Sequence, residues 1–134
     1  MNIPTTTIEL RTTLERDRPG ELAKAVTAIA NMGVNIEGYC EVDGKFHVVT
    51  SDPRGARTAL ETVGFVVEER EIFVIDAEDR PGFLANVLRR LSAEEVNLMW
   101  TYTLTKTRIA FTVDQPERVK EILHDLSPTT TRVR

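Results

Sequence analysis

The sequence is poor in cysteine, in aromatic residues and in long apolar runs. Its one cysteine, Cys40, excludes an internal disulfide, and so low a content is typical of a reducing compartment. No apolar run reaches the roughly 18 residues of a membrane span. The first ten residues, MNIPTTTIEL, also lack a basic segment followed by an apolar one. We therefore expect neither a membrane span nor a signal peptide, and a cytoplasmic location.

Positive charge is not in excess. The 134 residues carry 17 Lys and Arg against 21 Asp and Glu, a net charge of -4. Residues 1–72 hold 8 basic and 12 acidic residues, and residues 73–134 hold 9 of each. Neither part has the basic excess that a nucleic-acid partner requires. His47, His124 and Cys40 do not show metal-ligand spacing, so we expect no metal and no cofactor.

What the sequence does contain is an internal repeat. The segment RDRPGELAKAV at residues 16–26 returns as EDRPGFLANVL at residues 78–88, an offset of 62 positions. Eight of the twenty positions from 17 to 36 are identical to their counterparts in the second copy. A repeat of this length indicates two structural units, which we place at residues 1–70 and 71–134.

Hydrophobic periodicity predicts the same order of elements in both units. In the first we expect a strand at 6–14, a helix from about 20 to Gly33, strands at 34–42 and 45–51 joined by Asp43-Gly44, a helix from Asp52-Pro53 to Gly64, and a strand at 65–69. In the second we expect a strand at 71–77, a helix at 81–92, strands at 96–104 and 108–113, a helix carrying Val119 and Ile122, and a short final strand within 128–134. In the strand at 96–104, Trp100 and Tyr102 are expected to share a face with Leu98.

This βαββαβ order predicts an α+β fold. Each unit should be a ferredoxin-like, antiparallel sheet with its helices on one face and its second strand at an edge. Many functions occur on this fold, so the function must be argued from the site.

The strand, the D-R-P-G-x-L-A turn, the helix and the following V-N-I or V-N-L together resemble the ACT domain. This family consists of small regulatory modules that bind free amino acids, usually where two domains meet. The resemblance implies a non-catalytic regulatory or sensor protein whose effector is a free amino acid. It also implies a metabolic enzyme as partner in trans and a possible homodimer. ACT domains usually accompany an enzyme, and no catalytic domain is seen here.

The resemblance places ligand-binding residues at each turn and at the start of each second strand. These residues are Asp17, Arg18, Pro19, Gly20, Glu21, Leu22, Asn35 and Ile36 in the first unit, and Asp79, Arg80, Pro81, Gly82, Phe83, Leu84, Asn97 and Leu98 in the second.

The chemistry of these residues fits an amino acid. Proline suits the first turn of a helix, and the adjacent glycine leaves the helix N-terminus open to a carboxylate. An aspartate can accept the ammonium group, and an asparagine can donate or accept. The structural alternatives are that the aspartates merely cap helices and that the asparagines merely form Asx turns.

There are three alternative functions. An RNA-binding module would need more aromatic residues than Phe46 on its third strand. A small phosphatase would use Arg18 or Arg80 for phosphate, but the loop lacks a run of glycines. A regulatory subunit that binds only another protein remains open.

The two sites are not expected to be equivalent. Glu21 in the first unit corresponds to Phe83 in the second. If these side chains reach the ligand, the first pocket should favour a polar or basic side chain, and the second should favour an apolar one or be closed. The alternative is that both side chains point to solvent.

Overall fold

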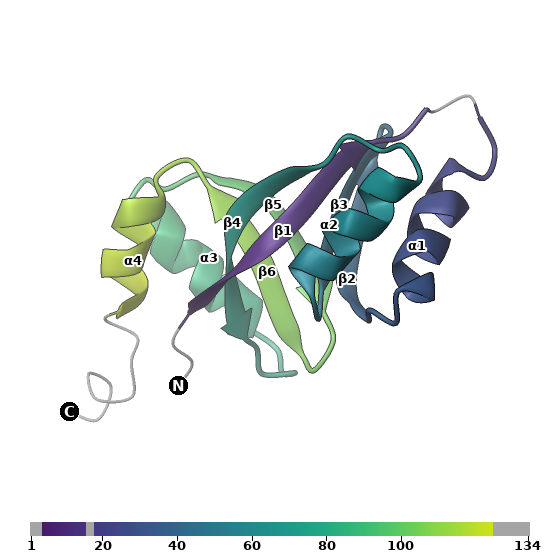
Figure 1. Ribbon diagram of the computed structural model, residues 1–134. Helices are drawn as coiled ribbons and strands as arrows, with labels where there is room; N and C mark the ends of the chain where they lie inside the picture. Colours follow the sequence, from purple (N-terminus) through teal and green to yellow (C-terminus); the bar gives the residue numbers. More distant parts are fainter. Residues whose placement is uncertain (1–3, 16–17, 125–134) are drawn as a thin grey trace. The chain divides into compact units, whose positions relative to one another are not determined.

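The computed structural model shows two compact units (Figure 1). It describes residues 4–15 and 18–124, with residues 123 and 124 described by their backbone only. The N-terminal unit comprises Thr7–Glu71, and the C-terminal unit comprises Ile72–Arg134 together with Met1–Thr6. Within the described ranges, no helix is long and apolar enough to cross a membrane.

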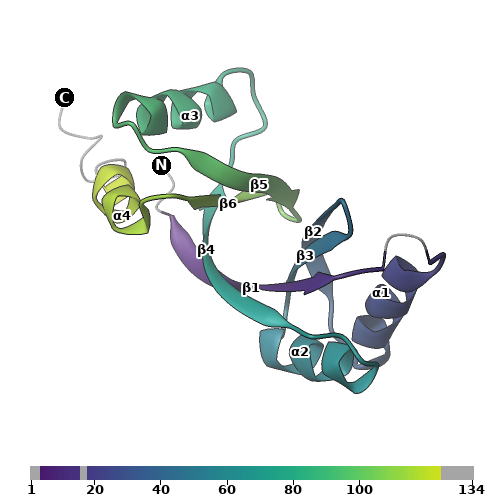
Figure 2. The ribbon, with the colours of Figure 1, turned by 90° about the horizontal axis from the view of Figure 1, so that it is seen from above.

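The N-terminal unit has the expected order of elements. It contains β1 (Thr5–Thr13) except for its first two residues, then α1 (Glu21–Asn31), β2 (Ile36–Val42), β3 (Lys45–Thr50) and α2 (Pro53–Thr62). It ends with the first residues of β4 (Glu68–Asp76). The strand order is β2-β3-β1-β4, and both β1 and β2 pair antiparallel with β3. Strand β2 lies at an edge, as predicted. Figure 2 shows α1 and α2 beside each other next to these strands.

The C-terminal unit repeats this plan with a different fourth strand. It contains the rest of β4, then α3 (Phe83–Ala93), β5 (Leu98–Leu104), β6 (Arg108–Val113) and α4 (Pro116–His124). The strand order is β5-β6-β4, and the other neighbour of β4 is β1, whose Thr5 and Thr6 belong to this unit. The hydroxyl of Thr5 donates to the carbonyl of Val74 at 3.5 Å. The final strand predicted within 128–134 lies outside the described residues.

Each unit has one core, between its helices and one face of its strands. In the N-terminal unit, Leu10 and Phe46 from the strands pack with Ile29 and Leu60 from the helices. In the C-terminal unit the corresponding cluster includes Phe73, Phe111, Leu91 and Val119. The prediction of an α+β, ferredoxin-like fold with helices on one face is confirmed.

Two local sequence signals act as predicted. Asp43 and Gly44 both have positive φ, 57° and 81°, the backbone of a tight two-residue hairpin turn. Asp52 caps α2 by accepting a hydrogen bond from the amide of Gly55 at 3.1 Å. Pro53, which follows the cap, has no amide hydrogen to leave unpaired at the first helical position.

Two expectations about the strands are wrong. The strands expected at 65–69 and 71–77, with no linker between them, form a single strand, β4 (Glu68–Asp76), which leaves residues 65–67 outside it; no glycine or proline interrupts the segment. In β5, the register with β6 shifts between Leu98 and Trp100. Thr101, paired with the core residue Phe111, therefore lies on the core face with Leu98, while Trp100 and Tyr102 lie on the other face.

Candidate functional site

The turn of the C-terminal unit joins β4 to α3 on the surface. Its residues Glu78, Asp79, Arg80, Pro81 and Gly82 are all exposed. The guanidinium of Arg80 donates to the carboxylate of Glu78 and lies 5.8 Å from the ring centre of Phe83. The hydrogen bond from Arg80, followed by its positive charge, lowers the pKa of Glu78. The arginine of this turn is therefore already paired with a carboxylate.

The turn of the N-terminal unit has a similar pairing. Asp17 lies outside the described residues, so its predicted role stays a prediction. Arg18 forms an ion pair with Glu15, with 2.9 Å between Nη2 and Oε2. The same turn lines a shallow cavity of about 360 Å³ that reaches the β2–β3 turn at Glu41 and Asp43. The side chains lining that cavity are mostly acidic.

Helices α1 and α3 begin at Glu21 and Phe83, each directly after an N-cap glycine, whereas proline was expected in the first helical turn. The N-cap residues are Gly20 and Gly82, with φ of 87° and 94°, and neither helix has a side-chain cap. Pro19 and Pro81 therefore lie before the helices, each separated from the first helical residue by the left-handed glycine. Asp79 does not cap α3, which removes the structural explanation for that aspartate.

We expect Gly82→Ala to lower the free energy of unfolding by about 1–2 kcal/mol, because alanine disfavours the left-handed region. No heavy atom lies within 4 Å of the position its Cβ would take, so the cost comes from the backbone alone. Gly82→Asn should cost less, since asparagine tolerates this conformation better. Denaturant unfolding of the two variants tests the order; equal losses, or no loss for alanine, would contradict it.

The two asparagines lie at the start of β2 and β5, and their backbones hold the strand in place. The backbone amide of Asn35 donates to the hydroxyl of Ser51, and the backbone amide of Ser51 donates to the carbonyl of Asn35. The backbone amide of Asn97 likewise donates to the carboxylate of Asp114, and the backbone amide of Asp114 donates to the carbonyl of Asn97. Both asparagine side chains are exposed. Among the described residues, neither side-chain amide makes a hydrogen bond, so the Asx-turn explanation is not supported.

Within one unit, the turn and the asparagine do not come together. They lie at opposite ends of α1 and of α3, each 11 residues long. At 1.5 Å per residue, such a helix is about 16 Å long. A single small ligand therefore cannot contact both groups of one unit.

The remaining predicted residues differ in how deeply they are buried. Leu22, Ile36 and Leu98 are half-buried against the cores, and Leu98 also lines a cavity of about 370 Å³ with Asn97. Leu84 is 47% exposed, whereas Phe83 is part of the C-terminal core. The solvent-facing alternative is therefore wrong for Phe83. Glu21 is half-buried and faces a cavity.

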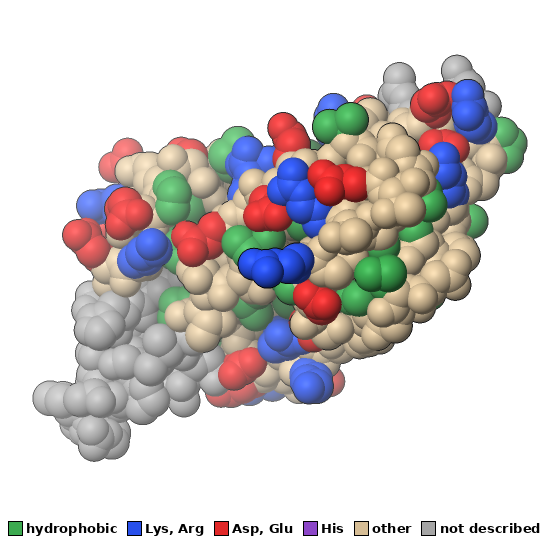
Figure 3. Space-filling model, viewed as in Figure 1, with side chains coloured by type: hydrophobic (Ala, Val, Ile, Leu, Met, Phe, Trp, Pro, Cys, Tyr) green, Lys and Arg blue, Asp and Glu red, His purple; other side chains and the backbone are tan. Residues whose placement is uncertain are grey.

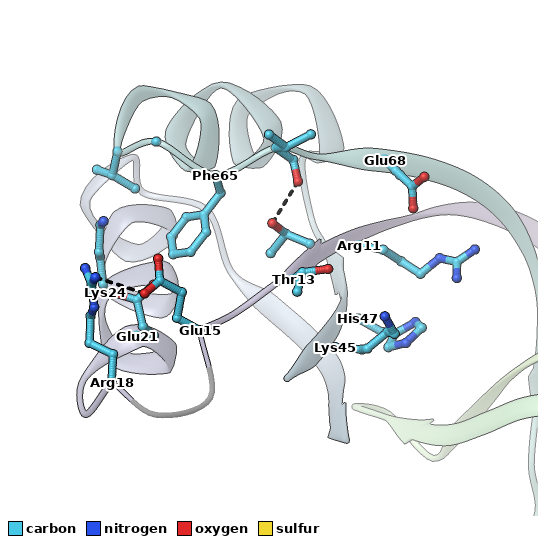
Figure 4. A pocket seen from close by; sticks show the side chains of 14 residues that line it. Arg11, Thr13, Glu15, Arg18, Glu21, Lys24, Lys45, His47, Phe65 and Glu68 are labelled. Carbon is cyan, nitrogen blue, oxygen red and sulfur yellow. Dashed lines mark hydrogen bonds and ion pairs between the residues drawn. The ribbon is translucent and has the colours of Figure 1, made fainter. Parts of the chain in front are cut away.

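The cavity that Glu21 faces belongs to the N-terminal unit. Its volume is about 600 Å³, and it lies between β1, β3, the start of α1 and the segment from α2 to β4 (Figure 4). The charged side chains lining it are Arg11, Arg18, Lys24, Lys45, Glu15, Glu21 and Glu68. Four are basic and three acidic, which leaves one positive charge in excess. The ammonium of Lys24 lies 5.1 Å from the ring centre of Phe65.

Sequence reasoning missed a buried ionic cluster beside this cavity. Glu9 and His47 are each 1% exposed, and Nδ1 of His47 lies 3.2 Å from Oε1 of Glu9. Nε of Arg11 lies 3.4 Å from the same oxygen. The alternation in β1, which puts Glu9 and Arg11 on one face, was the available signal, but nothing in the sequence pairs that face with β3.

The other candidates for chemistry are unremarkable in the structure. Burial, and then the charges of Glu9 and Glu41, raise the pKa of the Cys40 thiol, so it is not an activated nucleophile at neutral pH. Within residues 4–15 and 18–124, no three side chains are grouped so as to hold a metal ion. On the face seen in Figure 3, acidic and basic side chains are interspersed.

A family model described as an ACT domain pair matches residues 40–127. The chain belongs to this family. The match includes the second turn and Asn97, while the first turn and Asn35 lie before it. No curated protein sequence matches the chain.

Several solved structures resemble this ACT pair. Protein BT0572 from Bacteroides thetaiotaomicron superposes with a TM-score of 0.83 and 25% identity over 92% of this chain and 90% of that one. The regulatory subunit of aspartate kinase from Thermus thermophilus gives a TM-score of 0.63 and 18% identity over 92% of this chain and 95% of that one. Escherichia coli aspartokinase III, solved with lysine and aspartate, gives a TM-score of 0.59 and 14% identity over 93% of this chain but 31% of that one. The last two likenesses show the fold alone.

Proposed function

We propose that this ACT pair is a non-catalytic regulatory protein that binds a free amino acid at its D-R-P-G turns and second-strand asparagines. One observation carries the proposal. Both helices after the turns begin directly after a left-handed glycine without a side-chain cap, while both asparagine amides are exposed. The polar groups at the helix starts and on the asparagine side chains are thus left available to a ligand.

A free amino acid matches the groups at these places. Its carboxylate suits the N-terminus of α1 or α3, where backbone N–H groups and the helix dipole favour an anion. Its ammonium suits Asp79, and Asp17 by analogy. The side-chain amide of an asparagine in another unit can donate to the carboxylate or accept from the ammonium. Because turn and asparagine are separated within a unit, this site needs an inter-domain contact, which a homodimer would supply.

The ligand-bound protein would act on a metabolic enzyme in trans. The Thermus thermophilus neighbour is a regulatory subunit of aspartate kinase, which shows that this fold serves as a separate regulatory chain in that system. The small-phosphatase alternative is less favoured, because Arg18 and Arg80 are both ion-paired with glutamates.

A thermal-shift screen of the twenty L-amino acids tests the proposal. A ligand present at 100 times its dissociation constant should stabilise the folded state by about 2.7 kcal/mol, which gives a readily measured rise in melting temperature. Asn35→Ala and Asn97→Ala should reduce the rise because each removes a ligand contact.

Asn31→Ala is the matched control, since Asn31 is an exposed asparagine at the end of α1 and outside both sites. It should leave the rise unchanged. If none of the twenty amino acids raises the melting temperature, amino-acid binding is contradicted and a purely protein-binding regulatory role becomes the better account.

A further inference from the structure

The two units differ at the position that follows the end of their first helix. Helices α1 and α3 and the bulges of β2 and β5 recur at the same offset of 62 residues, so positions in this part of the fold correspond. The second residue after each helix has a left-handed backbone, with a φ of 73° for Gly33 and 59° for Glu95. Glycine suits this position, whereas glutamate adopts the left-handed backbone at a cost in stability. The C-terminal unit thus keeps a glutamate where the N-terminal unit shows that glycine suffices for the fold.

The backbone of Glu95 is held in place, but its carboxylate is not engaged. Its carbonyl accepts a hydrogen bond from the side-chain amide of Gln115 at 3.1 Å, and its amide donates to the carbonyl of Ser92 at 2.9 Å. The preceding Glu94 is paired with Arg118, with 2.6 Å between Oε1 and Nη2. The side chain of Glu95 is exposed, and no other described residue forms a hydrogen bond or ion pair with it. Interactions within the fold therefore do not account for this carboxylate.

Glu95 lines the same cavity as Asn97, on the side of the C-terminal unit where α3 lies beside β5 (Figure 2). The cavity has a volume of about 370 Å³. Its polar lining consists of Ser92, Glu95 and Asn97, and its apolar lining consists of Leu88, Leu91, Val96 and Leu98. At the positions of Ser92 and Glu95, the N-terminal unit has Ala30 and Gly33, so only the C-terminal unit surrounds its asparagine with further polar groups.

The apolar lining continues beyond this cavity. Leu88, Leu91 and Leu98 also line an apolar pocket between α3 and the strands, together with Leu84. Leu84 and Leu88 are 47% and 38% exposed, although both are large apolar residues on the helix. A few convergent polar groups beside an apolar surface are typical of a small-molecule site.

We infer that this cavity binds an L-amino acid with a large apolar side chain, and that Glu95 recognises its α-ammonium group. The carboxylate of Glu95 pairs with the ammonium beside Asn97, at the C-terminus of α3, where the helix dipole also favours a positive charge. The apolar side chain of the ligand lies over Leu88 and Leu98. The α-carboxylate is left for a D-R-P-G turn of another unit. This inference deepens the proposed function and rests on it, because it names the class of effector and a residue that determines specificity.

Titration calorimetry of the intact chain tests the inference with L-alanine, L-norvaline, L-leucine and 4-methylpentanoate, which is leucine without its ammonium group. Affinity should rise about three- to fourfold for each methylene group added between L-alanine and L-norvaline. L-leucine should bind at least about tenfold more tightly than 4-methylpentanoate, because only L-leucine can pair with Glu95. Glu95→Gln should weaken the binding of L-leucine by at least about tenfold and should not weaken that of 4-methylpentanoate.

Glu95→Gly separates a binding role from a structural one. It should not lower the melting temperature of the ligand-free protein, because glycine suits the left-handed backbone, yet it should weaken L-leucine binding by at least about tenfold. Lys106→Gly is the matched control, since Lys106 is exposed, has a φ of 62° and lies in the turn between β5 and β6, outside the cavity. It should leave the affinity for L-leucine unchanged.

Three results would each overturn the inference: an affinity that does not rise with the length of the apolar side chain, wild-type affinity for L-leucine in Glu95→Gln, or a lower melting temperature in Glu95→Gly. Its failure is distinguishable from that of the proposed function. If L-serine or L-aspartate stabilises the protein, and the effect depends on Asn97 but not on Glu95, the proposed function stands and this inference falls. If no amino acid binds, both fall.

Discussion

Phe83→Ala is expected to lower the free energy of unfolding by about 3–5 kcal/mol, the cost of removing a buried aromatic ring. Phe83 is 8% exposed and packs in the C-terminal core, although it follows Gly82 in the turn where a ligand contact was predicted. Glu21→Ala, at the equivalent position of the N-terminal unit, should change stability by no more than about 0.5 kcal/mol. Denaturant titration followed by circular dichroism measures both.

Leu84→Ala is the matched control at the next residue of α3, because Leu84 is 47% exposed. It should cost clearly less than Phe83→Ala. If Phe83→Ala cost less than about 1 kcal/mol and instead changed ligand affinity, Phe83 would be a binding residue and its assignment to the core would be contradicted.

Glu9→Ala is the second substitution with a large expected effect. Oε1 of Glu9 lies 3.2 Å from Nδ1 of His47 and 3.4 Å from Nε of Arg11, and Glu9 and His47 are each 1% exposed. Removing one member of a buried ionic cluster costs about 3–5 kcal/mol, because the charge that remains is poorly solvated. We expect a loss of that size in denaturant unfolding.

Glu71→Ala is its control, because Glu71 is an exposed glutamate in β4, and it should change stability by about 0.5 kcal/mol at most. In a double-mutant cycle, Glu9→Ala and His47→Ala should show a coupling energy of about 0.5–3 kcal/mol. Strictly additive losses would show that the 3.2 Å contact between Glu9 and His47 contributes nothing specific.

Most of the fold could be predicted because its local signals are strong and agree with one another. The strand predicted at 108–113 is β6, the Asp43-Gly44 turn has the expected positive φ, and Asp52 caps α2. Each of these depends on a few neighbouring residues, so the sequence contains all the information needed.

The errors have causes that are not local. The register shift between Leu98 and Trp100 has a counterpart between Ile36 and Gly38, at the same position of the repeat. A bulge depends on the pairing with the neighbouring strand, so the period of two in the sequence does not reveal it. The same holds for the buried contact between Glu9 and His47, which are 38 residues apart.

The candidate site was predictable in part. The repeated turn and the repeated asparagine identify the places where polar groups are exposed. They do not show that proline lies outside the helix, which follows from the left-handed N-cap glycine. Nor do they show that Phe83 enters the core while Glu21 faces a cavity, since burial after a turn depends on how the helix packs on its sheet.

The most direct test of amino-acid binding at the turns is a ¹H–¹⁵N correlation spectrum of the protein titrated with the L-amino acid that stabilises it most. The account predicts saturable shifts of the backbone amides that follow Gly20 or Gly82 at the start of α1 or α3, because these N–H groups receive the carboxylate. It also predicts shifts of the side-chain amide of Asn35 or Asn97. Titrations with all twenty amino acids that shift neither turn nor either asparagine would contradict the account.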